Sequence, residues 1–68
     1  MTPIKDYYCE STPTEEELKE SLNIAINENC VVHLKWFVRY DGWYDRYIHK
    51  NTNIEEMNKQ LRHIIYGM

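Results

Sequence analysis

Apolar side chains recur at helical spacing in two segments of the chain, which predicts two amphipathic helices. In residues 13–27 they fall at i, i+4, i+7 and i+8, and residues 53–66 carry a second stripe. Ile24 falls on the opposite side of the first helix, where it is either an ordinary exposed apolar residue, which we favour, or part of a contact. Gly67 suits the C-cap of the second helix. The first stripe comprises Leu18, Leu22, Ala25 and Ile26, and the second Ile54, Met57, Leu61, Ile64, Ile65 and Met68.

A Thr-x-x-Glu pattern precedes each stripe and predicts where the helix begins. Thr12 with Glu15, and Thr52 with Glu55, match the capping box, in which the hydroxyl and the carboxylate each accept a backbone N–H. Pro13 would then occupy the first helical position, where its missing N–H has no partner to lose.

The segment between the helices has the character of a β-hairpin. It is rich in β-branched and aromatic residues and is interrupted by Asp41 and Gly42. An Asp-Gly pair between two such runs is a strong hairpin signal. It predicts strands over residues 31–39 and 43–49.

Two loop lengths give the hairpin different registers. A two-residue turn would place Asp45 and His49 on the apolar face. A three-residue loop of residues 40–42, with the glycine left-handed, pairs Arg39 with Trp43 and also places His33 opposite His49. We favour the second register because it gives one face an almost wholly apolar set: Val32, Leu34, Trp36, Val38, Tyr44 and Ile48.

These elements predict a small α+β fold of one domain, residues 1–68, with the order (β)-α-β-β-α. We expect an antiparallel hairpin packed on one face by two amphipathic helices, since the two stripes and the apolar strand face need one another. Residues 1–10 are either an edge strand or an irregular cover over the core.

The favoured register leaves a second face that combines aromatic and cationic side chains. These side chains could be ordinary cross-strand packing, an interface for a protein or a second copy, or a stacking surface for a nucleotide or single-stranded nucleic acid. The candidate partner-binding residues are Lys35, Phe37, Arg39, Trp43 and Tyr47.

The charge distribution bears on these alternatives. The net charge is −3, which makes nucleic acid an unlikely partner, although the hairpin has a local excess of cations. Acidic residues concentrate in the first helix, where they either contact a basic partner or form a solvated face at the favourable end of the helix dipole. They are Glu15, Glu16, Glu17 and Glu20.

The sequence predicts no catalytic set, metal site or cofactor. Cys9 and Cys30 form no Cys-x-x-Cys motif, and we expect reduced thiols. In the favoured register Cys30 and His33 lie on opposite sides of one strand, and the pair His33 and His49 lacks the further ligands that a metal needs. His63 falls outside the apolar stripe, so we expect it on the surface.

No apolar run approaches the ~18 residues of a membrane span, and no secretory signal is recognisable at the N-terminus, so we expect a cytoplasmic protein. The leading hypothesis is a small non-enzymatic module that binds a protein partner. An inhibitor of a host defence complex, encoded by a phage or mobile element, is its most specific form. The alternatives are a binder of nucleotides or single-stranded nucleic acid, and a structural subunit that self-associates as a homodimer.

Overall fold

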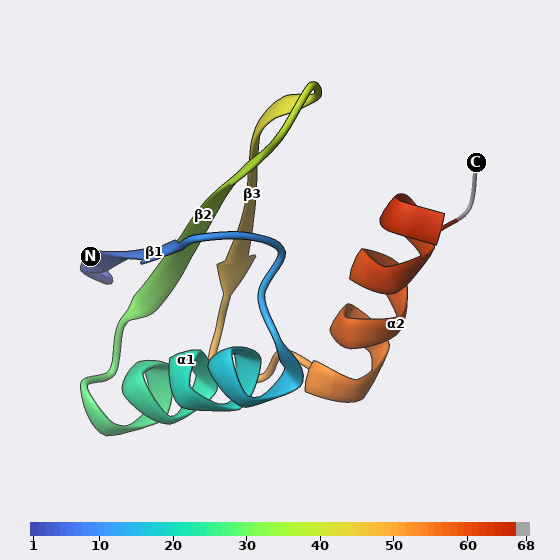
Figure 1. Cartoon of the computed structure of the whole chain (residues 1–68). Coiled ribbons are helices and arrows are strands. Elements are labelled where there is room, and N and C mark those ends of the chain that lie inside the picture. The colour runs from blue at the N-terminus through green and yellow to red at the C-terminus, as the bar shows by residue number, and fades with distance from the viewer. Residues whose placement is uncertain (67–68) are drawn as a thin grey trace.

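A three-stranded mixed sheet with two helices packed against it forms the structure (Figure 1). The computed structural model describes residues 1–66, and side-chain environments as far as residue 63. Strand β2 is central, parallel to β1 and antiparallel to β3. The elements are β1 (Ile4–Cys9), α1 (Glu15–Asn27), β2 (Val31–Val38), β3 (Gly42–Ile48) and α2 (Ile54–Tyr66).

The first ten residues contribute a strand and not an irregular cover. Ile4 lies beside Val31 and Cys9 lies beside Trp36, so β1 runs parallel to β2 along six residue pairs. A parallel pair needs a crossover between its strands, and α1 supplies it. The chain therefore opens with a β-α-β unit, and the hairpin follows it.

Helix α1 begins two residues later than predicted. The Glu17 amide donates to Thr14 Oγ1 at 3.1 Å, and the Thr14 amide donates to Glu17 Oε1 at 2.9 Å. The capping box therefore belongs to Thr14, and its assignment to Thr12 was wrong. Pro13 lies before the cap and is fully buried, which fixes the entry of the chain into the helix.

The buried side of α1 is also rotated from the predicted stripe. Leu18, Ser21 and Ala25 are fully buried, whereas Ile26 is 53% exposed. Ile24, expected to be exposed, packs against the core. The serine is accommodated because its hydroxyl donates to the main-chain carbonyl four residues earlier, at 2.9 Å, so no buried polar atom lacks a partner there.

Helix α2 is capped by Asn53. Its side-chain oxygen accepts the Glu56 amide at 3.0 Å. The predicted cap, Thr52, instead closes the preceding turn, where its hydroxyl accepts the His49 amide at 2.7 Å. The predicted C-cap, Gly67, lies outside the described residues.

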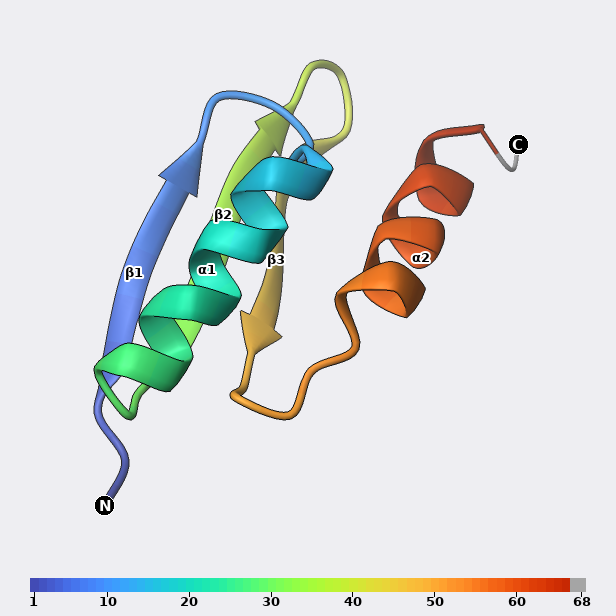
Figure 2. The same cartoon turned by 90° about the horizontal axis from the view of Figure 1, so that it is seen from below.

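The core lies between the sheet and the helices. Figure 2 shows α1 lying over the sheet, along β2, and α2 standing to the side of β3. From α2, Ile54 and Leu61 are buried in the core and Met57 packs against it, as predicted, whereas the rest of the predicted stripe lies beyond the described side chains. Arg62 of α2 donates to the Pro13 carbonyl and so ties the helix to the start of α1. The buried sheet residues are Cys9, Val32, Leu34, Trp36 and Ile48.

Candidate functional site: the open face of the sheet

The hairpin loop has the predicted length but a different position. Val38 pairs with Gly42, so the loop consists of residues 39–41 and not 40–42. Trp43 faces Phe37 instead of Arg39, which shifts the register by two residues from the prediction. Because side chains alternate with a period of two, this shift leaves every strand residue on the face predicted for it.

The observed register is stabilised by aromatic pairs and places strain in the turn. Phe37 and Trp43 pack edge to face at 5.5 Å between ring centroids, and His33 stacks on Tyr47 at 4.3 Å. Such cross-strand pairs contribute about 0.5–1.5 kcal/mol each. In return, Tyr40 takes a left-handed conformation with φ +75°.

Three strands contribute to the face that the helices leave uncovered, which we call the open face. Of the predicted binding residues, Lys35, Phe37, Trp43 and Tyr47 lie on it together, whereas Arg39 lies in the turn with its guanidinium 5.2 Å from the Tyr40 ring centre. The full set is Ile4, Asp6 and Tyr8 from β1, Val31, His33, Lys35 and Phe37 from β2, and Trp43, Asp45 and Tyr47 from β3.

The aromatic side chains of the open face are accessible. Trp43 is 68% exposed, Tyr8 64%, Phe37 48% and Tyr47 47%. Tyr8 was missed by the sequence reasoning because residues 1–10 had no assigned structure. The exposed aromatic area therefore extends across all three strands, one more than predicted.

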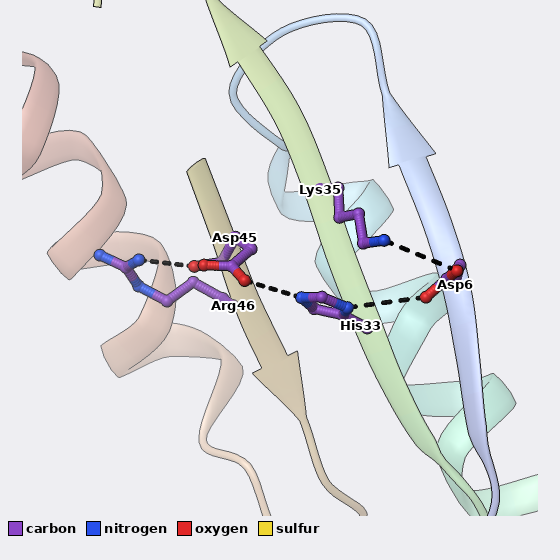
Figure 3. A network of polar contacts seen from close by, with 5 residues as sticks. All are labelled: Asp6, His33, Lys35, Asp45 and Arg46. Atoms are coloured by element: carbon purple, nitrogen blue, oxygen red, sulfur yellow. Dashed lines mark hydrogen bonds and ion pairs between the residues drawn. The ribbon is translucent and has the colours of Figure 1, made fainter. Parts of the chain in front are cut away.

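A polar network crosses the sheet among these aromatic residues (Figure 3). His33 Nε2 lies 2.8 Å from Asp45 Oδ2, and its Nδ1 lies 3.6 Å from Asp6 Oδ1. Lys35 Nζ lies 3.6 Å from Asp6 Oδ2. The network joins β1, β2 and β3, and it sets one lysine and one histidine against two carboxylates. Asp6 is a further open-face residue that the sequence reasoning did not assign.

The amine of Lys35 is directed toward β1. It lies 5.4 Å from the Tyr8 ring centre as well as near Asp6. Partial burial lowers the pKa of Lys35, but the neighbouring Asp6 and Tyr8 raise it more, so the pKa ends above its ordinary value. The lysine is therefore a charged and locally paired member of the open face.

The histidines do not form the predicted pair. His33 lies opposite Tyr47, and His49 falls after the end of β3. Within residues 1–66, no group of three or more histidine, cysteine or acidic side chains is arranged to hold a metal ion. His63 is exposed on α2.

Both cysteines are free and buried. Burial raises the pKa of the Cys9 thiol to about 12, and the nearby Glu17 carboxylate adds to the effect. The Cys30 thiol lies 3.8 Å from the Ile24 carbonyl, which accepts its weak hydrogen bond. The Cys9 thiol is therefore a poor nucleophile, because the reactive form is the thiolate.

The acidic residues proposed as a second contact have different environments. Glu15 pairs with Lys19 at 3.3 Å, Glu17 completes the helix cap, and Glu20 accepts the Tyr7 hydroxyl at 3.2 Å. Glu16 is exposed. They belong to α1, on the side of the sheet opposite the open face, so the two predicted contact surfaces are separate.

Comparison with protein-family models, curated proteins and solved structures gives no match to this chain. Among the described residues, no helix has the length and apolar character needed to cross a membrane. Function therefore has to be inferred from the geometry of the chain itself, and the open face is its most distinctive surface.

Proposed function

We propose that the chain is a small non-enzymatic module that binds a protein partner through its open face. The observation that carries the proposal is the exposure of aromatic side chains from all three strands, with Trp43 at 68%. Aromatic residues are enriched in the cores of protein interfaces, and large contiguous apolar patches are uncommon on monomers of this size. A partner that covers these rings would remove them from water.

The two edge strands of the sheet carry charges that oppose pairing with a further strand, which favours association through the open face instead. Lys5 of β1 and Arg46 of β3 lie beside Val32 and Leu34 on the core side of the sheet. Lys5 pairs there with Glu28 at 3.1 Å. Inward-pointing charges on edge strands are a means by which proteins oppose pairing with a further strand. On the open face Lys35 is paired with Asp6, and the face has no comparable protection.

A non-enzymatic role is supported by the position of the groups that catalysis would need. His33, the histidine of the open face, contacts carboxylates and a tyrosine ring. Neither buried cysteine is on its side of the sheet, and the buried Ser21 hydroxyl donates within α1. We infer no nucleophile, cofactor or metal in the proposed role.

The two other hypotheses make different demands on the same face. Nucleic acid would need unpaired cations, but Lys35 is paired with Asp6, and Asp45 adds a second carboxylate. A homodimer would need a self-complementary surface. The more specific hypothesis of a phage-encoded inhibitor rests on size and composition, and it stays a prediction.

The first experiment measures the solution mass by light scattering over a concentration series. A mass of 8.3 kDa at all concentrations supports a face available to a foreign partner, whereas a stable dimer that Trp43→Ser dissociates assigns the face to self-association. If Trp43 fluorescence is quenched by an oligonucleotide in a salt-sensitive way, the nucleic-acid hypothesis replaces the proposal.

The second experiment compares captured partners between variants. A double variant, Phe37→Ser with Trp43→Ser, should lose the partner, because it removes two exposed rings and leaves the core unchanged. The control is Glu16→Lys on α1, which should retain it. If both retain the partner, the open face is not the interface. If only Glu16→Lys loses the partner, and binding of the partner to the unmodified chain is salt-sensitive, the acidic helix is the contact surface.

A further inference from the structure

A shallow hollow lies beside Trp43 on the β3 side of the open face. Its volume is about 240 Å³, and among the described residues it is lined by Lys35, Trp43, Tyr44 and Asp45. The Trp43 ring is 68% exposed, and its edge-to-face contact with Phe37 holds it in place. The hollow thus brings together the Trp43 ring and the Asp45 carboxylate, while the Tyr44 ring stacks on Trp36 on the core side of the sheet.

One oxygen of this carboxylate is available to a ligand. Asp45 Oδ2 lies 2.8 Å from His33, while no described side chain or backbone group donates a hydrogen bond to Oδ1. A carboxylate with a spare acceptor next to an aromatic ring suits a cation, because the ring attracts positive charge and the oxygen accepts its protons.

Lys35 also lines the hollow, and its positive charge would repel a bound cation, but its amine is directed away from the hollow. Figure 3 shows the Lys35 side chain extending toward β1 and Asp6, away from Asp45. Its Nζ lies 3.6 Å from Asp6 Oδ2 and 5.4 Å from the Tyr8 ring centre. The charge of Lys35 is therefore partly compensated by Asp6 on the far side of β2, and Asp45 is the carboxylate that lines the hollow.

We propose that this hollow receives an arginine side chain of the protein partner, with the guanidinium stacked on Trp43 and bonded to Asp45. The inference rests on the proposed function, because it names the chemistry of the partner at the same face. Arginine fits better than lysine, since a planar guanidinium can stack on a ring and donate to a carboxylate at once, whereas an ammonium is a compact and strongly hydrated charge. The net charge of −3 favours the approach of such a cation.

The test titrates the ¹⁵N-labelled chain with N-acetyl-arginine amide and follows the two tryptophan indole N–H signals by NMR. Trp43 is the reporter, and Trp36, which is 1% exposed, is the internal control. N-acetyl-citrulline amide is the neutral probe of the same shape, and N-acetyl-lysine amide carries the same charge on an ammonium. We expect a saturable shift of the Trp43 signal with arginine, a weaker one with lysine and none with citrulline.

Two variants locate the site. Asp45→Asn keeps an oxygen that can accept from His33 but removes the charge, and it should weaken arginine binding about fivefold. Glu16→Gln makes the same change in net charge on α1 and should leave the affinity unchanged. Trp43→Leu, followed through the backbone amide of residue 45, should abolish the shift. Spectra of the free variants show that each one is folded before it is titrated.

Equal shifts with arginine and citrulline, no shift at all, or equal weakening by both charge variants would overturn the arginine assignment. These outcomes are distinct from failure of the proposed function. A partner that is lost with Phe37→Ser and Trp43→Ser but retained with Asp45→Asn would establish the interface and refute only the arginine contact.

Discussion

The turn of the hairpin offers a sharp test of the observed register. Tyr40 has φ +75° and follows Arg39 in a turn closed by the Asp41 amide, which donates to the Val38 carbonyl at 3.0 Å. The angle is that of the third residue of a type II turn, a position that favours glycine. In the register predicted from the sequence, the left-handed residue would be Gly42 alone. Replacing Tyr40 therefore distinguishes the two registers.

The informative comparison is between Tyr40→Gly and Tyr40→Ala. Both remove the ring of Tyr40, which is 92% exposed and lies beside the Arg39 guanidinium, so the effect of its loss cancels between them. At a left-handed position, alanine has a strain of about 1–2 kcal/mol that glycine lacks. Glycine in turn loses about 0.5–1 kcal/mol through the greater freedom of its unfolded chain. The midpoints of these two ranges predict that the glycine variant is about 0.75 kcal/mol more stable than the alanine variant, within a span of about 0–1.5 kcal/mol.

Urea or thermal unfolding measures this difference, with the fluorescence of the buried Trp36 as the signal. A gap of 1 kcal/mol corresponds to about 4–8 °C in Tm for a chain of this size. The test depends on which of the two variants is more stable. With an ordinary negative φ at residue 40, the alanine variant would be the more stable one. That order would refute the observed turn and its register. As a control, Gly42→Ala should also destabilise, since Gly42 has φ +103° and an added Cβ would meet no atom within 4 Å, so only backbone strain is introduced.

Further predictions concern the helix cap and the buried thiol. Thr14→Ala should lower the free energy of unfolding by about 1 kcal/mol, whereas Thr12→Ala should change it much less, and chemical denaturation of both variants checks which threonine caps α1. Cys9 should resist a thiol reagent at pH 8 until the chain is unfolded, because its pKa is raised to about 12; rapid labelling of the folded chain would contradict this. The pKa of the Tyr7 hydroxyl is also raised to about 12, so Cys9 and Tyr7 both ionise at lower pH in the unfolded chain than in the folded one. The stability that these two neutral groups contribute should be complete below about pH 9 and should be lost between there and about pH 12. Unfolding curves across this pH range measure the decline.

The local sequence pattern predicted the two helices, which follow from the helical period. It also predicted which hairpin residues share a face, because side chains alternate with a period of two and a register shift of two residues leaves the faces unchanged. It did not predict the register itself. The left-handed backbone predicted at Gly42 is observed, with φ +103°, but Tyr40 is left-handed as well, and the aromatic pairs that accompany its strain exist only once the strands have met. The helix starts show the same limit, because both Thr12 and Thr14 are followed three residues later by glutamate. The helix is capped by the later threonine, Thr14, and Pro13 is buried between the two threonines. This burial is a tertiary effect that the local sequence does not show.

Strand β1 could not be assigned because neither of its faces is clearly apolar. Tyr7 and Cys9 face the core together with Lys5, whose charge is met by Glu28 at the far end of α1. Parallel pairing with β2 brings together residues separated by a whole helix, and no short-range signal marks such a pair. The sequence pattern therefore could not predict the part of the open face that β1 contributes.

The contribution of β1 changes the character of the open face as well as its width. With the hairpin alone, Lys35 would be a cation beside exposed aromatic rings, which is the pattern of a nucleic-acid surface. Asp6 lies 3.6 Å from both Lys35 and His33, and from the neighbouring strand its carboxylate compensates the positive charge of Lys35. A partner that covers the aromatic rings then has little cationic charge to satisfy, whereas Asp45 keeps one oxygen for a donor of its own. For this reason the completed sheet favours an apolar contact with a cation at its border over a contact with phosphate.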